Sequence, residues 1–190
     1  MELTIEQAIE LAHNHLQKNE FDQASEICQK ILQIDPQYSP AYYLLGLVQL
    51  RLNNFENARK YVVHSMSLDS SESVIHNTYG LILEKFGLLK SSALSYQWAS
   101  LINPYDPIIN YNLSNVLRSL NYQDEAEKKL RKAVKLDPNI ANLESPVLHL
   151  NPTDISQVAF ELYYQLVEVN CLVRSGYPQE GIKQYQSILG

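Results

Sequence analysis

The 190-residue chain is 45% hydrophobic and 19% charged, an ordinary globular balance, and its formal net charge is -6. The negative balance argues against a nucleic-acid partner, because phosphate binding depends on clustered lysine and arginine. Residues 1–6 lack the basic start and apolar run of a signal peptide, and no apolar run of about 18 residues occurs. We therefore expect a cytoplasmic protein without a membrane span, in which Cys28 and Cys171 are reduced thiols.

Three prolines mark an internal repeat. Pro36, Pro104 and Pro138 are spaced by 34 residues or by twice that number, and the missing position is Ser70. Each of the four positions follows an aliphatic residue and an Asp or Asn, as in Ile34-Asp35-Pro36. Because proline cannot continue a helix, these phrases are predicted to end one helix before the next begins.

When repeats that start at residues 5, 39, 73 and 107 are aligned, small and turn-forming residues recur at three positions. We call each such position a column. The eighth position holds Ala12, Gly46, Gly80 and Ser114. The twentieth position holds Ala24, Ala58, Ser92 and Ala126. The fifteenth position, where the left-handed conformation would end a helix, holds Asn19, Asn53, Gly87 and Asn121. Because closely crossing helices need small residues, the columns predict helix-turn-helix repeats over 5–38, 39–72, 73–106 and 107–140.

These columns resemble the tetratricopeptide-repeat (TPR) family, whose 34-residue pattern has small residues at positions 8 and 20 and proline at position 32. The resemblance covers residues 5–138 and implies an all-α fold, a right-handed α-solenoid of helix-turn-helix repeats. The sequence departs from the family at position 11, which lacks the usual tyrosine, and at position 4, where an aromatic residue is common. Position 4 here holds Ala8, Tyr42, His76 and Asn110.

The repeat spacing breaks after residue 140. Residues 141–153 contain two prolines and no small-residue column, and they are predicted to form an inserted loop. Residues 154–190 are predicted to form an extended helix and a divergent fifth TPR-like unit, because Gly176 and Gly181 restore positions 15 and 20. The helix is apolar on two faces and no polar capping helix follows it. Two explanations stay open, a truncated N-terminal region of a longer protein and a homo-oligomer formed through these helices.

The resemblance also implies a concave groove lined by positions 2, 5, 6, 9, 12 and 13 of each first helix. The residues carried over are Tyr43, Asn77, Leu81, Tyr111, Asn112, Asn115 and Arg118. Asparagine can both donate to and accept from a peptide backbone, so we expect a protein or peptide partner bound with little sequence preference. Leu81, like Leu44 and Leu47, has an alternative role in packing between adjacent repeats.

No catalytic motif interrupts the repeats, so the chain is expected to be no enzyme and to hold no cofactor or metal. His13 and His15 are two residues apart and cannot form a helical metal pair. Basic residues cluster between residues 128 and 135. Three acids, at residues 124, 125 and 127, each lie four residues before a base of this cluster, and these three pairs favour a solvated face of paired charges. The prediction is a non-catalytic interaction scaffold. The alternatives are the recruiting region of a larger bacterial glycosyltransferase or methyltransferase, and a self-assembling scaffold.

Overall fold

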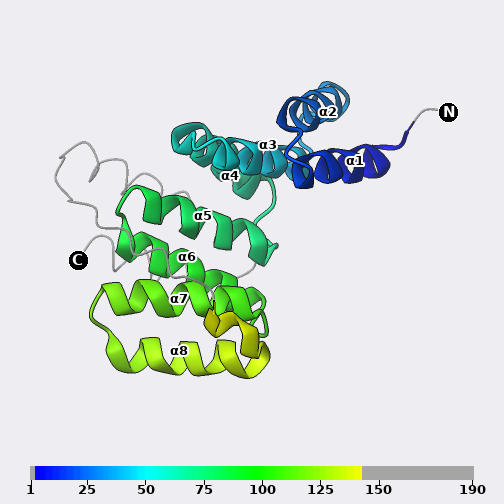
Figure 1. Ribbon diagram of the computed structural model, residues 1–190. Helices are drawn as coiled ribbons and strands as arrows, with labels where there is room; N and C mark the ends of the chain where they lie inside the picture. The colour runs from blue at the N-terminus through cyan, green and yellow to red at the C-terminus, as the bar shows by residue number, and fades with distance from the viewer. Residues whose placement is uncertain (1–2, 143–190) are drawn as a thin grey trace, which may run out of the picture. The chain divides into compact units, whose positions relative to one another are not determined.

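The computed structural model describes residues 3–142, which are all-α as predicted. Eight α-helices and one 3-10 helix occupy these residues: α1 (Ile5–Gln17), α2 (Phe21–Ile34), α3 (Ser39–Arg51), α4 (Phe55–Leu68), α5 (Ser73–Lys85), α6 (Leu89–Ile102), α7 (Pro107–Ser119), α8 (Gln123–Leu136) and η1 (Pro138–Asn142). Consecutive helices form antiparallel pairs joined by short turns (Figure 1). The chain divides after Ser70 into two units, with α1 to α4 in the first and α5 to η1 in the second.

The helix boundaries repeat with the period of the sequence. The first helices of the four pairs begin at residues 5, 39, 73 and 107, and the second helices begin at 21, 55, 89 and 123. Both series advance by 34 residues. The helix ends therefore follow local signals that recur in each repeat.

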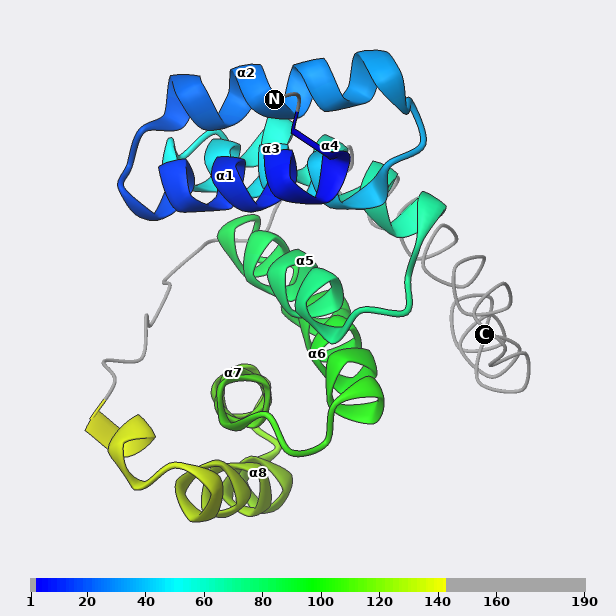
Figure 2. The same cartoon turned by 90° about the vertical axis from the view of Figure 1, so that its right-hand side faces the viewer.

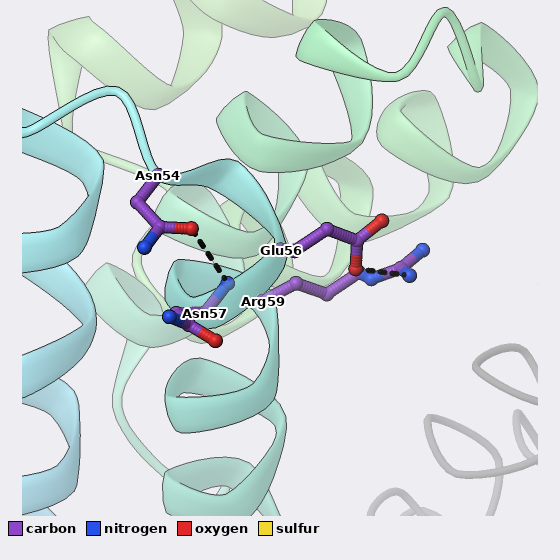
Figure 3. Close-up of polar contacts among 4 residues, drawn as sticks. All are labelled: Asn54, Glu56, Asn57 and Arg59. Carbon is purple, nitrogen blue, oxygen red and sulfur yellow. Dashed lines mark hydrogen bonds and ion pairs between the residues drawn. The ribbon is translucent and has the colours of Figure 1, made fainter.

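Side-chain caps fix several of these starts. Thr4 and Gln7 form a capping box on α1, in which each side chain accepts from the other residue's backbone N–H. The Asp106 carboxylate accepts from the first backbone N–H groups of α7, directly before the proline that opens this helix. At the start of α4 the Asn54 side chain accepts from the backbone N–H of Asn57 (Figure 3). Each cap satisfies a donor that the helix itself leaves unpaired.

An ion pair reinforces the first turn of α4. The Glu56 carboxylate lies 2.9 Å from the Arg59 guanidinium, and the two side chains extend from the same side of the helix (Figure 3). Glu56 is mostly exposed, whereas the Arg59 side chain is only 4% exposed. A carboxylate in the first turn also complements the positive end of the helix dipole.

The turn inside each pair depends on one left-handed residue. Asn19, Asn53 and Asn121 have φ values of 61°, 58° and 67°, and Gly87 has 73°. The predicted left-handed role of this column is confirmed. Asparagine and glycine adopt this conformation at the lowest cost, because other side chains meet the following carbonyl oxygen.

This conformation leads to a first prediction. Asn121→Gly should leave the free energy of unfolding unchanged or slightly raised, whereas Asn121→Ala should lower it by about 1 kcal/mol. Urea unfolding followed by far-ultraviolet circular dichroism measures both. Asn14→Ala, at an exposed position inside α1, is the matched control and should not destabilise the protein. Equal stabilities of the Asn121→Gly and Asn121→Ala variants would contradict the role of the turn.

The small columns lie where paired helices touch. Ala12, Ala24 and Ala58 are 0% exposed and Ala126 is 1% exposed. In the first unit, Ala12 and Ala24 share a core with Cys28, Leu44 and residues of α1 to α3. In the second unit, residues of α5, α6 and α7 surround Tyr96 and Leu113, both 0% exposed. The predicted close crossing of antiparallel helices is confirmed in these pairs.

Two glycines allow the closest approaches. A Cβ atom on Gly46 would lie 2.6 Å from the Val62 side chain. A Cβ atom on Gly80 would lie 2.6, 2.8 and 2.9 Å from three ring atoms of Tyr96. Val62 and Tyr96 occupy the same repeat position, where the first repeat has the smaller Cys28 opposite Ala12. The space at position 8 therefore decreases as the residue opposite it grows.

Position 4, where the sequence departs from the TPR pattern, still joins adjacent repeats within each unit. The Tyr42 hydroxyl donates to the Pro36 carbonyl at 3.2 Å. The Asn110 amide, which is completely buried, donates to the Pro104 carbonyl at 3.1 Å. A phenol and a carboxamide can thus donate to the same carbonyl position of the preceding repeat.

The predictions for the C-terminal third fall largely outside the described residues. The 3-10 helix η1 includes residues 141 and 142, the first two of the predicted loop. The rest of that loop lies outside the described part of the chain. So do the extended helix and the fifth TPR-like unit predicted over 154–190, together with any homo-oligomer formed through them.

Candidate functional site

The predicted groove residues are divided between the two units. Tyr43 lies half-buried on α3 of the first unit, and the other six lie on α5 and α7 of the second. The second unit therefore contains the candidate site, on the first helices of its two pairs.

Two asparagines from different repeats meet there. The Nδ2 of Asn112 on α7 donates to the Oδ1 of Asn77 on α5 at 3.0 Å, and both side chains are half-buried. Among the described residues, neither side chain makes another hydrogen bond. Asn77 thus keeps its N–H groups and Asn112 keeps its carbonyl oxygen for a further partner.

Asn115 extends this polar strip by one helical turn. Its Oδ1 is buried and has no hydrogen-bond partner among the described residues. A buried acceptor without a donor costs about 1–3 kcal/mol, so such groups are rare unless they serve a purpose. We call Asn77, Asn112 and Asn115 the amide face.

The remaining predicted residues differ in exposure. Tyr111 is 7% exposed and packs with Ala133 and Ile140. Leu81 packs against the core that contains Tyr96 and Leu113, in keeping with its alternative role in packing between repeats. Leu44 and Leu47 pack in the same way in the first unit. Arg118 is exposed in the last turn of α7, where a cation favours the negative end of the helix dipole.

A polar cluster inside the second unit was not predicted. The Tyr96 hydroxyl donates to the Glu84 carboxylate at 2.5 Å, and the Ser92 hydroxyl donates to the Gly80 carbonyl at 2.9 Å. Burial raises the pKa of the Glu84 carboxyl above its ordinary value. Burial first, and then the charge of Glu84, raise the pKa of Tyr96. The sequence offered one signal for this cluster, because Glu84 is an acid within the apolar stretch of α5.

The predicted charge pairing on α8 is wrong for two of its three pairs. Glu127 and Arg131 form the expected ion pair. Lys128 and Lys129 make no ion pair with the acids four residues before them or with any other described residue. Lys129 instead donates to the Ser100 hydroxyl on α6 at 3.4 Å, because the helix face that carries it turns toward the preceding repeat.

No group of three or more His, Cys, Asp or Glu residues could hold a metal ion within residues 3–142. Cys28 is completely buried, and its burial raises the thiol pKa to about 12, so the reactive thiolate is strongly disfavoured. Over the same residues, no helix is long and apolar enough to cross a bilayer.

Four features of the described residues are typical of a TPR solenoid. They are paired helices of nearly equal length, a 34-residue period, small residues where the paired helices cross, and left-handed residues in the turns. Two tetratricopeptide-repeat models match the chain, one over residues 8–64 and the other over residues 108–140. The chain belongs to the tetratricopeptide-repeat family. Repeats of this family generally mediate protein–protein interactions and are typically non-catalytic, and neither matching model describes a catalytic family.

Individual TPR proteins are similar to the chain at low identity. Anaphase-promoting complex subunit 3 of Schizosaccharomyces pombe is 22% identical over 131 residues, which cover 69% of this chain and 20% of that protein. The crystal structure of MamA covers 100% of this chain and 95% of its own, with a TM-score of 0.62 and 16% identity. YrrB, described as a TPR protein with an unusual peptide-binding site, has the same TM-score and identity and covers 96% of this chain and 83% of its own. At these identities the structural likeness concerns the fold alone.

Proposed function

We propose that the chain is a non-catalytic scaffold that binds an extended segment of a partner protein on the amide face. The observation that carries this proposal is the Asn112–Asn77 hydrogen bond of 3.0 Å, which joins two repeats and leaves a donor and an acceptor unpaired among residues 3–142. A peptide group also has one N–H and one C=O, so one backbone unit can pair with both asparagines. The resulting recognition depends on the peptide backbone and tolerates many side chains.

Asn115 supports the same proposal. Its unpartnered Oδ1 lies on the helix that carries Asn112, three residues further along. Residues three apart occupy the same side of a helix, so a strand-like peptide that pairs with Asn112 would continue past Asn115. A second backbone N–H would then relieve the cost of the unpaired acceptor.

The amide face consists of neutral side chains, which fits a peptide backbone. Arg118 and Lys85, the basic residues at positions 12 and 13 of the same two helices, lie in the last turns of α7 and α5. Tyr111 is buried in the core and contributes mainly to the position of α7. The peptide-binding site described for YrrB agrees with a peptide as ligand.

A binding experiment tests the proposal. Peptides of about a dozen residues, selected from a random displayed library against the full chain, are labelled and titrated by fluorescence anisotropy. Asn77→Ala and Asn112→Ala should each weaken binding about 3- to 10-fold, since each removes about one hydrogen bond. N-methylation of the contacted peptide bond should weaken it to a similar extent, whereas most side-chain changes in the peptide should not.

Asn14→Ala is the matched control, because it removes an exposed asparagine from a first helix of the other unit. Circular dichroism must give the same helicity for all variants. Unchanged affinity of the Asn77→Ala and Asn112→Ala variants, with peptides still bound, would refute the amide face as the binding site.

A second candidate is that the repeats recruit partners for a larger protein or assembly. The chain spans one fifth of anaphase-promoting complex subunit 3, whose name places it in a multi-subunit complex. The gene sequence beyond codon 190 tests the enzyme form of this idea: a glycosyltransferase or methyltransferase domain in frame supports it, and an immediate stop codon removes it. Light scattering over a range of concentrations tests self-assembly, which a strict monomer would exclude.

A further inference from the structure

A basic and apolar surface lies on the second unit, on α6, α8 and the turn after α6, whereas the amide face lies on α5 and α7. It consists of Leu101 at the end of α6, Tyr105 in the turn that follows, and Lys128, Lys129 and Lys132 on α8. We call these five residues the lysine–tyrosine surface. In Figure 2 the turn that joins α6 to α7 faces the viewer, near α8.

Two contacts bring these segments together. The Lys129 ammonium donates to the Ser100 hydroxyl, next to Leu101, at 3.4 Å. The Lys132 ammonium lies over the ring of Tyr105, 5.9 Å from its centroid. The stem of each lysine thus spans the space between α8 and the preceding repeat, and the ammonium groups gather beside the apolar residues.

The apolar members are unusually exposed. Tyr105 is 76% exposed and Leu101 is 59% exposed. Burial of these exposed apolar side chains against a partner's apolar side chain would gain hydrophobic free energy. Neither residue belongs to the two buried clusters described for the second unit.

The cations of this surface lack anionic partners. No described carboxylate lies within ion-pair distance of Lys128, Lys129 or Lys132. Burial first, and then the charges of Lys132 and Lys128, lower the pKa of Lys129. These three ammonium groups repel one another, and an external anion would reduce that repulsion. Residues 71–142 carry eight Lys and Arg against seven Asp and Glu, although the whole chain has a net charge of -6.

We propose that the lysine–tyrosine surface docks an acidic segment of a partner protein that carries a leucine or aromatic side chain between its carboxylates. The carboxylates pair with Lys128 and Lys132, and the apolar side chain covers Leu101 and Tyr105. Nucleic acid fits less well, because three lysines neutralise few phosphates and the chain as a whole is negative. This site is separate from the amide face, so it can operate whether or not a peptide binds there.

The test uses the full chain and a synthetic probe of about eight residues in which Glu and Asp surround one Leu and one Phe. Two matched probes separate the contributions: one replaces the acids by Gln and Asn, and the other replaces Leu and Phe by Ser. Fluorescence anisotropy should give the tightest binding for the acidic-apolar probe. Affinity should fall by about tenfold for each matched probe and should decrease as salt rises.

Variants locate the binding site. Lys128→Gln/Lys132→Gln should weaken the acidic-apolar probe by about tenfold, and Tyr105→Ala should weaken it by a similar factor. Lys30→Gln/Lys60→Gln, at exposed positions of the first unit, is the matched control and should change nothing. Asn77→Ala/Asn112→Ala should bind this probe normally, which distinguishes the two sites. Melting curves confirm that each variant is folded, and all substituted residues except Asn77, Asn112 and Lys132 are exposed.

Three results would overturn the proposal. One is equal binding of the acidic-apolar probe and its charge-neutral match. Another is equal loss of binding in the Lys30→Gln/Lys60→Gln control. The third is binding of single-stranded nucleic acid as tightly as the acidic-apolar probe, which would indicate a general anion surface.

Discussion

Gly80→Ala should destabilise the protein by about 2 kcal/mol. The added Cβ would lie within 2.9 Å of three ring atoms of Tyr96, which is completely buried. Overpacking of this kind costs about 1–3 kcal/mol, and three contacts on a confined ring indicate the upper end of that range. Alanine gains about 0.5–1 kcal/mol over glycine inside a helix, which offsets only part of the cost. Urea unfolding measures the difference.

The same substitution should change sign when the ring is removed. Tyr96→Cys introduces the residue that the first repeat has at this position, Cys28, which shares a buried core with Ala12. Tyr96→Cys alone should cost about 3–5 kcal/mol through the lost aromatic volume. In that background, Gly80→Ala should stabilise the protein by about 0.5–1 kcal/mol. Destabilisation of similar size in both backgrounds would show that Tyr96 does not limit the space at Gly80.

Tyr96→Phe should lower the free energy of unfolding by about 1.5–3 kcal/mol at neutral pH. The hydroxyl donates to the Glu84 carboxylate at 2.5 Å, and hydrogen bonds to charged groups contribute about this much. Phenylalanine keeps the packing of the ring but leaves the half-buried carboxylate with one donor fewer. The cation of Lys85 remains as a group that favours its charged form.

The cost of Tyr96→Phe should depend on pH in a defined direction. Burial raises the pKa of Glu84 in the folded state, so the folded chain binds this proton more tightly than the unfolded chain. The contribution of Glu84 to stability therefore increases as pH falls from neutral through the raised pKa, and levels off below the ordinary glutamate range. Protonated Glu84 depends less on the Tyr96 donor, so the cost of Tyr96→Phe should shrink over the same range.

Glu84→Gln isolates this effect. The amide retains an acceptor for Tyr96 and does not titrate, so the pH-dependent part of the Glu84 contribution should disappear. The exposed acids Glu6 and Glu26 have lowered pKa values and contribute with the opposite sign, but they are common to both proteins and cancel in the difference. Stability profiles of wild type and Glu84→Gln that stay parallel between pH 4 and 7, to within about 0.3 kcal/mol, would contradict a raised pKa for Glu84.

Local sequence signals predicted the regular part of the fold. The residue types at Asn19, Asn53, Gly87 and Asn121 predicted the left-handed turn, because few side chains tolerate that conformation. The small columns predicted the helix crossings, because close contact between helices excludes larger residues. Both properties depend on a residue and its near neighbours, and the 34-residue spacing repeats them four times.

The candidate site was less accessible to prediction. Column positions placed Asn77 and Asn112 on first helices, but the hydrogen bond between them depends on the spacing of two repeats. The same column rule selected Tyr111, whose ring lies in the core formed with α8 and η1. Position in a repeat therefore indicates the side of a helix, whereas burial depends on which neighbours cover that side.

The sequence alone determined the repeat class, the starts of the first helices and the turn residues of this protein, because backbone sterics and helix caps act over a few residues. Tertiary structure decided which polar groups are paired. Lys128 and Lys129 have acids at the spacing for helical ion pairs, yet they make none, and Lys129 donates to Ser100 of the preceding repeat. Glu84 likewise pairs with Tyr96 of the next helix. A long polar side chain can form several alternative interactions that have similar free energies. Only the packing of whole helices decides which of these interactions forms.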